Sequence, residues 1–512
     1  MLVKTYGSAV QGVDACTITI EVHLGRPFGF AMVGLPDSAV RESRERVETA
    51  LKVNDFEWPR GRLTINMAPA DIRKEGSAYD LAIGLGILAA SGQISAEMID
   101  RYVIMGELSL DGTLQPVRGV LPIAIAARRE GFTGFILPRA NASEAAIVND
   151  LDIIAVDNLR EAVDFLDGKN SITPLFRDTR EIFEAAQDDL PVDFEDVKGQ
   201  ILVKRALMVA AAGGHNALMI GPPGAGKTML AKRLPTILPP LTLREALDTT
   251  KIHSVAGHLG KNASLLAHRP FRSPHHTISD VALVGGGSFP QPGEISLAHN
   301  GVLFLDELPE FKRGVLEVLR QPMEERHITV SRARFTVDYP ANFMLVASMN
   351  PCPCGFYNHP DKECLCGPQL VRRYLSRISG PLMDRVDLQI EVTPVDFEQL
   401  SGNLQEESSA EIRMRVVAAR DRQIARFEKY DGIYSNAMMP SRLVREICRI
   451  DNQGRGYLQK AIDVLGLSAR AYDRILKVAR TIADLADSDP IEATHVAEAI
   501  HYRNLDRENW AG

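Results

Sequence analysis

The chain has 512 residues, of which 45% are hydrophobic and 24% are charged. This length suits about three domains, and the balance predicts sizeable cores with little disorder. The net charge of −8 excludes an overall positive field for nucleic acid, so any such contact must come from local basic patches. The chain has neither a long apolar run nor a signal-peptide pattern at its start, so we expect a cytoplasmic protein that does not contact a membrane.

The pattern of residues 1–170 predicts a separate α+β domain. Short apolar strands alternate there with helical stretches: strands at 16–22 and 63–67, and helices at 80–90 and 122–129. The composition changes over the next stretch, which ends in the acidic run Gln187–Pro191. We therefore expect residues 171–191 to be a linker.

Two segments of this first domain resemble the protease domain of Lon, an S5 domain 2-like fold. Met105–Val120 is similar to the pattern around the catalytic lysine of that family, and Lys74–Ala78 is similar to its serine loop. A Ser–Lys dyad needs both members, because the amine must remove the hydroxyl proton. Ile123 stands where the family has its lysine, and the serine loop is one residue short. The resemblance thus implies a Lon-like fold without peptidase activity, in which Ser77 is a turn or helix-cap residue.

The segment from Gly221 to Thr228 matches every position of the phosphate-binding loop GxxxxGK[ST]. A short apolar strand precedes it and a helix start follows, so backbone N–H groups and a helix N-terminus can hold phosphates. Lys227 would reach the β- and γ-phosphates of ATP, and the Thr228 hydroxyl would hold Mg²⁺. The expected nucleotide contacts are Gly221, Pro222, Pro223, Gly224, Ala225, Gly226, Lys227, Thr228 and Met229.

A second apolar strand, 301–305, ends in the adjacent carboxylates of Asp306 and Glu307. Asp306 would complete the Mg²⁺ coordination, and Glu307 would polarise the attacking water, a role expected in a hydrolase rather than in a kinase. A third strand, 343–349, ends at Asn350, whose amide could orient that water. These three segments in this order resemble the Walker A, Walker B and sensor 1 elements of AAA+ ATPases.

Two stretches contain candidate contacts for the phosphates of a nucleic acid. Residues 328–337 predict a β-hairpin with a short basic tip, where Arg332 and Arg334 could bind phosphates without reading bases. An exposed hairpin without a ligand is the alternative. The block 269–277 supplies the further candidates Arg272, His275 and His276. Adjacent histidines diverge and rarely bind one metal ion together, so an interaction loop is favoured over a metal site.

Four of the six cysteines follow Asn350 closely and define an insertion over residues 352–366. Four thiolates can bind one tetrahedral Zn²⁺, whereas reduced thiols or a redox pair are the alternatives. A closed site of four sulfurs leaves no position for water, so such a zinc would be structural and not catalytic. The expected ligands are Cys352, Cys354, Cys364 and Cys366.

The last part of the chain, residues 396–512, predicts a helical domain. Residues 410–428 and 469–485 have apolar side chains at three- and four-residue spacing. The nucleotide motifs all lie between the linker and this region, so we expect residues 192–395 to form the ATPase core.

Val192–Gln200 and the block 269–287, together with these motifs, resemble the ComM/YifB family of magnesium-chelatase-like AAA+ ATPases over essentially the whole chain. The resemblance implies a ring, expected to be a hexamer, in which ATP hydrolysis drives branch migration of DNA in recombination and natural transformation. It also implies that Arg385 is an arginine finger, with Arg377 as the second candidate for that role, and that Arg470 is the sensor 2 residue. The alternatives are a motor that remodels proteins or assists a chelatase, and a nucleotide switch, against which Glu307 argues.

Overall fold

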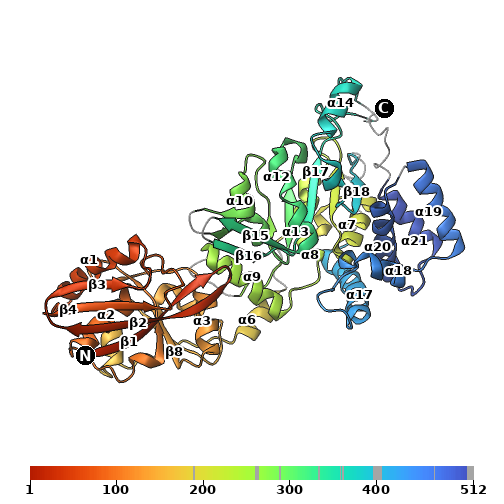
Figure 1. Ribbon diagram of the computed structural model, residues 1–512. Coiled ribbons are helices and arrows are strands. Elements are labelled where there is room, and N and C mark those ends of the chain that lie inside the picture. The colour runs from red at the N-terminus through yellow and green to blue at the C-terminus, as the bar shows by residue number, and fades with distance from the viewer. Residues whose placement is uncertain are drawn as a thin grey trace. The chain divides into compact units, whose positions relative to one another are not determined.

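The computed structural model describes residues 1–187, 191–259, 265–287, 290–332, 335–357, 359, 362–395, 406–465 and 467–503. The chain divides into two compact units (Figure 1). Unit 1 comprises Met1–Ala186 with Leu243–Ala267, and unit 2 comprises Gln187–Thr242 with His268–Gly512. Across the described ranges, no helix combines the length and the apolar character that crossing a membrane requires.

Unit 1 is built on a mixed sheet of seven strands in the order β3-β4-β2-β1-β5-β8-β9. Its first pair is antiparallel and long, running from Leu2 opposite His23 to Gln11 opposite Asp14. Strand β2 pairs antiparallel with β4 as well, whereas the other pairs of this sheet are parallel. The strands are β1 (Leu2–Gln11), β2 (Asp14–Gly25), β3 (Gly29–Val33), β4 (Arg62–Ala68), β5 (Tyr102–Ile104), β8 (Gly134–Pro138) and β9 (Asp152–Val156), and a separate pair is formed by β6 (Glu107–Leu108) and β7 (Leu114–Gln115).

The helices of unit 1 bury apolar residues against this sheet. Helix α2 is buried at every position and packs on β1 and β2, which suits a helix that is apolar on all sides. Helix α1 begins at Asp37, whose carboxylate accepts a hydrogen bond from the Val40 N–H at 2.8 Å. The helices are α1 (Ser38–Val53), α2 (Asp80–Ala90), α3 (Val120–Arg129), α4 (Ala142–Ala145), α5 (Leu159–Leu166) and α6 (Thr179–Ala186).

Unit 1 also contains α9 (Leu243–Ala256), which belongs by position to the core expected at 192–395. This helix packs against α3. The Ser254 hydroxyl donates to Glu144 Oε1 at 2.5 Å, and the Ser254 carbonyl accepts from the Gly119 N–H at 3.2 Å. These partners lie more than a hundred positions away in the chain, so local sequence patterns do not reveal that the segment leaves the core.

Unit 2 contains a parallel sheet of five strands in the order β11-β14-β17-β10-β18. Strands β10, β14 and β17 are buried at every position, as expected for a parallel sheet that is covered on both faces. Because the strands are parallel, the loops that follow them meet at one edge, here called the carboxyl edge, and the opposite edge is called the amino edge. The strands are β10 (Ala217–Ile220), β11 (Phe271–Arg272), β14 (Val302–Leu305), β17 (Met344–Met349) and β18 (Leu388–Glu391).

The remaining elements of unit 2 surround this sheet. The expected hairpin is present, with Arg332 opposite Phe335 next to its turn. The helices are α7 (Ile201–Gly213), α8 (Lys227–Ile237), α10 (Asp280–Val284), α11 (Glu294–Leu297), α12 (Arg313–Glu317), α13 (Arg320–Glu325), α14 (Pro368–Leu375) and α15 (Gly380–Met383). The short strands are β12 (Gly285–Gly286) and β13 (Gln291–Pro292), and the hairpin is β15 (His327–Arg332) with β16 (Phe335–Pro340).

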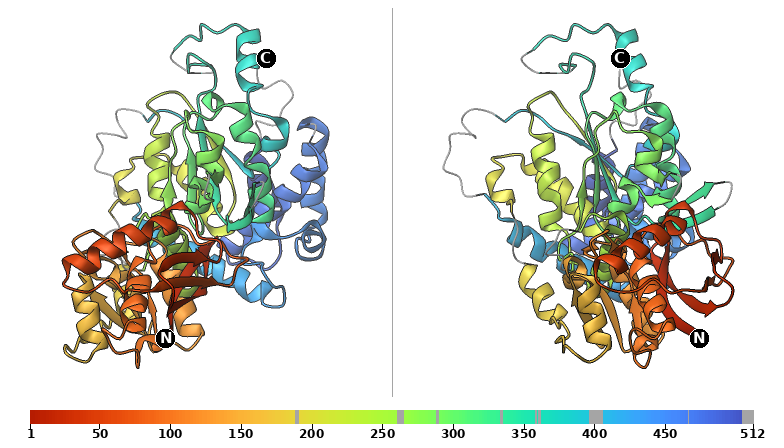
Figure 2. Two further views of the ribbon diagram at one scale, coloured as in Figure 1. Left: turned by 60° about the vertical axis from the view of Figure 1, so that its left-hand side comes forward. Right: turned by 90° about the vertical axis from the view of Figure 1, so that its left-hand side faces the viewer.

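The C-terminal part is helical, as predicted, and is drawn in blue in Figure 2. Helix α17 begins with a capping box in which Ser408 and Glu411 exchange hydrogen bonds. This helix packs on α7 and α8, and α20 packs on α7, so the C-terminal helices share an apolar core with the sheet. The helices are α17 (Ser409–Phe427), α18 (Ser441–Ile447), α19 (Asn452–Leu465), α20 (Ala469–Leu485) and α21 (Ala493–His501).

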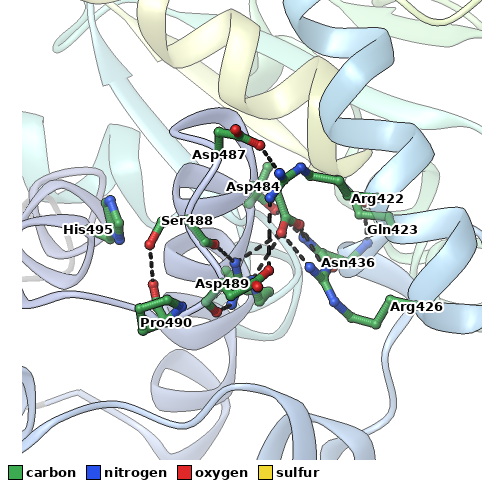
Figure 3. Close-up of polar contacts among 12 residues, drawn as sticks. Arg422, Gln423, Arg426, Asn436, Asp484, Asp487, Ser488, Asp489, Pro490 and His495 are labelled. Atoms are coloured by element: carbon green, nitrogen blue, oxygen red, sulfur yellow. Dashed lines mark hydrogen bonds and ion pairs between the residues drawn. The ribbon is translucent and has the colours of Figure 1, made fainter.

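A buried carboxylate joins these helices to one another (Figure 3). The Asp484 side chain is fully buried and pairs with Arg426 at 2.5 Å and with Arg480 at 3.0 Å. The Asn436 amide donates to the same carboxylate at 2.8 Å. A buried charge is tolerated when paired and hydrogen-bonded in this way, so Asp484 connects α17, α20 and the turn at Asn436.

Candidate functional site

The phosphate-binding loop lies at the carboxyl edge of unit 2, between β10 and α8. Gly224 and Gly226 have φ values of 82° and 87°, which L side chains rarely adopt. A Cβ on Gly221 would lie 2.1 Å from the Val392 carbonyl oxygen, so only glycine fits there. The backbone between these glycines can therefore approach a phosphate group closely.

Lys227 begins α8 and has only 8% of its surface exposed. Its Nζ donates to the Gly221 carbonyl at 2.7 Å, to the Pro222 carbonyl at 2.9 Å and to Asn350 Oδ1 at 3.2 Å. Burial lowers the pKa of this amine, and the nearby carboxylates of Asp306 and Glu307 act in the opposite direction. One ammonium group thus connects the loop with the end of β17.

Thr228 and Asp306, both predicted to hold magnesium, lie in direct contact. The Thr228 hydroxyl donates to Asp306 Oδ2 at 2.8 Å, and the second carboxylate oxygen accepts hydrogen bonds from the Ser348 hydroxyl and from the Glu307 N–H at 3.0 Å. Sequence reasoning missed Ser348, although it is a polar residue within an otherwise apolar strand. A hydroxyl and a carboxylate are the oxygen ligands that Mg²⁺ prefers, so the donor set fits this ion.

Glu307 follows Asp306 in a left-handed conformation, with φ 52° and ψ 48°. That conformation is uncommon for a residue other than glycine and often marks a functional site. The side chain is 59% exposed, and its Oε2 lies 3.6 Å from His276 Nδ1. The strand end thus presents an exposed carboxylate near Lys227 of the phosphate loop.

Among the other DNA-contact candidates, Arg272 is already neutralised. Its guanidinium forms two hydrogen bonds of 2.6 Å with the Glu294 carboxylate, which raises the pKa of Arg272. The rings of His275 and His276 do not diverge as expected but lie tilted beside each other, with centroids 4.1 Å apart and an interplanar angle of 34°. His275 also contacts the Thr277 hydroxyl at 2.9 Å. Arg332 lies in β15, and its side chain is outside the described atoms; Arg334 lies outside the described residues.

The four cysteines of the insertion lie together. The Cys352 sulfur lies 3.3 Å from that of Cys354 and 3.7 Å from that of Cys364, and all four sulfurs are within 4.8 Å of one another. Tetrahedral thiolate ligands at about 2.3 Å from a zinc ion are about 3.8 Å apart, so the set fits such an ion. The described cysteines are all free thiols. The cluster could therefore hold one structural metal ion.

Arg385 and Arg470, expected to act on a nucleotide, lie at the amino edge. Arg385 is 7% exposed, and its guanidinium binds Glu324 Oε1 at 2.7 Å and the Pro381 carbonyl at 2.6 Å. The Arg470 side chain is largely exposed and lies 3.7 Å from Asp384. Both arginines thus lie at the end of the sheet opposite the phosphate loop. The reserve candidate Arg377 instead pairs with Glu310 after β14.

Sequence reasoning also missed an ion pair that joins α20 to the sheet. Arg474, one turn beyond Arg470, binds the buried carboxylate of Asp387 and donates to the Arg385 carbonyl at 3.3 Å. The Asn216 N–H donates to the same carboxylate at 2.9 Å. Burial by itself would raise the pKa of Asp387, but Arg474 and His215 outweigh it and hold that pKa well below its usual range.

The first domain lacks a Ser–Lys pair at the position that resembles the Lon site. The Ser77 hydroxyl donates to Glu107 Oε2 in the turn before α2, and no side chain caps that helix. Ile123 is buried in α3. Lys74, within the serine loop, donates to the Pro69 carbonyl. These contacts contain no amine bonded to the Ser77 hydroxyl among the described residues.

In this parallel sheet the glycine-rich phosphate loop follows β10, the Asp–Glu pair follows β14, and an asparagine follows β17, which lies between these two strands. This arrangement defines a P-loop nucleoside triphosphatase of the AAA+ type. Family models agree with this class. The model described as "Magnesium chelatase, subunit ChlI" matches residues 193–400, "Subunit ChlI of Mg-chelatase" matches 18–141, and the ChlI C-terminal model matches 406–503.

Two similar proteins align with nearly the whole chain, and a third aligns with part of it. Competence protein ComM of Haemophilus influenzae is 44% identical over 510 residues, which cover 99% of this chain and 98% of that protein. The protein YifB of Escherichia coli is 45% identical over 505 residues, covering 98% and 96%. The magnesium-chelatase 67 kDa subunit of Chlorobaculum tepidum is 26% identical over 209 residues, covering 40% and 27%. The chain belongs to the ComM/YifB family of magnesium-chelatase-like AAA+ proteins.

Proposed function

We propose that this protein is a ring-forming ATP hydrolase, a hexamer, that drives branch migration of DNA in homologous recombination and natural transformation. The observation that carries hydrolysis is the contact network at the carboxyl edge, where Lys227 meets Asn350 and Thr228 meets Asp306. The proposal that the protein acts on DNA is supported by its similarity, over nearly the full length, to a protein named for competence.

Each residue of the network has a distinct task. Bound ATP with Mg²⁺ would supply the reactive phosphoanhydride and the charge that these groups recognise. Lys227 would neutralise the β- and γ-phosphates, while Thr228 and Asp306 would hold the ion. The exposed carboxylate of Glu307 would accept a proton from the attacking water, and the Asn350 amide would orient that water.

The position of Arg385 and Arg470 at the amino edge supports the proposal that several copies assemble into a ring. Strand β10 has four residues, so its two ends are about 13 Å apart at about 3.3 Å per residue. Arg385 and Arg470 at the amino edge would therefore serve a nucleotide held by a neighbouring copy. Charge builds on the γ-phosphate during hydrolysis, and a cation from a neighbour would complete its neutralisation.

The first domain and the cysteine cluster are assigned supporting roles. We propose that residues 1–170 have the Lon-like fold without peptidase activity, which the Ser77–Glu107 contact and the buried Ile123 support. We also propose that the four cysteines hold a structural Zn²⁺. The cluster packs against Val371 and Leu375, so the metal would fix α14.

Hydrolysis and branch movement test the main proposal together. Glu307→Gln keeps the shape of the side chain but removes the base, so hydrolysis is expected to fall by about 10²–10⁴-fold. Branch migration on four-way DNA should stop in parallel. Glu325→Gln, an exposed carboxylate on α13, is the matched control and should behave as wild type.

Two results would contradict the proposal in different ways. Rapid hydrolysis that no DNA stimulates, with no branch movement, would instead favour a motor that remodels proteins or assists a chelatase. Retained hydrolysis in Glu307→Gln would remove that residue from its role.

Metal analysis tests the zinc assignment. Wild-type protein is expected to contain about one zinc per chain after dialysis against a weak chelator, because four thiolates close the coordination sphere. Cys364→Ser should lose the metal, whereas Cys448→Ser, a buried cysteine elsewhere, should keep it. Zinc-free wild type would rule the assignment out.

A further inference from the structure

A basic cavity of about 580 Å³ lies in unit 2, apart from the phosphate loop. It is formed by the residues between β14 and α12 and by the end of α14; helices α12 and α14 are labelled in Figure 1. Its lining consists of Pro309, Glu310, Phe311, Arg313, Arg373, Ser376 and Arg377. Three of these seven side chains are guanidinium groups, and one is a carboxylate.

The cations in this cavity are only partly neutralised. Arg377 Nη1 lies 2.9 Å and 3.0 Å from the two carboxylate oxygens of Glu310, so this pair is internally balanced. Arg313 and Arg373 are exposed, and within the described part of the chain neither side chain has a hydrogen bond or an ion pair. The cavity therefore has an excess of two positive charges in a protein whose net charge is −8.

The positive surface continues beyond the cavity, because Lys312 is exposed next to Arg313. Helix α14 is held by packing of its Val371 against the buried Cys352, so the wall that contains Arg373 is anchored to the cysteine cluster. Cations on two elements suit a strand of successive phosphates better than a single ion.

We propose that this cavity binds phosphate groups of a nucleic-acid strand. A guanidinium group can donate two parallel hydrogen bonds to a phosphate, and Arg313 and Arg373 have these donors free. The other polar side chains of the lining are already engaged, Glu310 with Arg377 and the Ser376 hydroxyl with the Arg373 carbonyl, so we expect binding that is independent of sequence. The proposal rests on the proposed action on DNA and names where the strand is held.

One comparison favours a strand over a free nucleotide, and a second favours this cavity over Arg272 as the place where phosphates bind. The cavity has no glycine-rich backbone such as the one that approaches phosphates at Gly221–Thr228. Among the candidates that the sequence offered, Arg272 is neutralised by Glu294 through two short hydrogen bonds. Arg313 and Arg373 therefore offer the free cations that Arg272 lacks.

Removing both free cations in the full-length protein tests the proposal. Arg313→Ala/Arg373→Ala is compared with Arg442→Ala/Arg445→Ala, which removes the same charge from exposed positions on α18. Binding of a labelled single-stranded oligonucleotide is measured by fluorescence anisotropy at several salt concentrations. The first variant should bind about tenfold more weakly at ~0.1 M salt, and its slope of log K against log salt should be smaller by about 1.4.

The control variant should match wild type. Arg313→Lys/Arg373→Lys should recover the salt slope because the charges remain, but only part of the affinity because lysine lacks the paired donors of a guanidinium group. Wild-type affinity and slope in the alanine variant, with DNA-stimulated hydrolysis intact, would overturn this site alone. Failure of wild type to bind any DNA would overturn the site together with the proposed function. Lost hydrolysis without DNA, with oligonucleotide binding intact, would assign the cavity to a nucleotide's phosphates and refute the strand.

Discussion

The two edges of the parallel sheet in unit 2 use charged residues in opposite ways. At the carboxyl edge Glu307 is 59% exposed in a left-handed conformation, and glycines leave room for a ligand. At the amino edge Asp387 is buried and satisfied by Arg474 and by the Asn216 N–H. The first arrangement costs stability and supplies reactive groups, whereas the second joins α20 to the sheet. Substitutions at the two edges should therefore separate activity from stability.

The largest effect on stability is expected at the amino edge. Arg474→Met should lower the free energy of unfolding by about 3–5 kcal/mol, because it leaves the Asp387 carboxylate buried without its cation. Urea unfolding followed by circular dichroism measures the change. Arg442→Met on the exposed surface of α18 is the control and should change stability by less than about 0.5 kcal/mol. Equal stability of the two variants would show that this pair does not hold α20.

A substitution at the carboxyl edge should change the rate of hydrolysis rather than stability. Ser348→Ala removes the hydroxyl that donates to Asp306, so hydrolysis at low Mg²⁺ should fall by about tenfold or more. Excess Mg²⁺ should restore part of the rate if the serine orients the carboxylate, and the melting temperature should change little. Ser331→Ala, an exposed hydroxyl on β15, serves as the control. A loss of rate that no concentration of Mg²⁺ relieves would argue against an orienting role.

Lowering the pH is expected to have a smaller effect on the free energy of unfolding. The folded-state pKa of Asp387 lies below its unfolded value of about 4, so its contribution is fully present above pH 4 and is lost as the pH falls further. Over that acid range, wild type should lose up to about 1.4 kcal/mol per pH unit more than Asp387→Asn. Unfolding free energies measured between about pH 5 and pH 2.5 test this. Parallel curves for the two proteins would show that Asp387 is not the titrating group.

Local patterns predicted much of the carboxyl edge. The phosphate loop and the pair Asp306–Glu307 are contiguous motifs at strand ends, so their chemistry follows from residue order. The apolar strands of the core and the C-terminal helices were predicted for the same reason, since apolar runs and helical spacing are local signals. Ser348 was not predicted, because a single hydroxyl in an apolar strand has no motif that reveals its partner.

The amino edge and the packing of α9 could not be predicted in this way. Arg474 was overlooked beside the motif residue Arg470, and its partner Asp387 lies 87 positions earlier in the chain. Arg313 and Arg373 each lie at an exposed helix position outside any motif, and only the fold brings them to one cavity. In each case the signal is a contact between distant segments.

The sequence by itself determined the nucleotide chemistry of this protein, because a phosphate loop needs consecutive residues with fixed backbone conformations. It also determined the family, through motifs that continue over nearly the full length. Only the tertiary structure decided which charges are free and which are paired. Burial and ion pairing depend on neighbours from other strands and helices, and these set whether an arginine holds the fold together or remains available to a ligand.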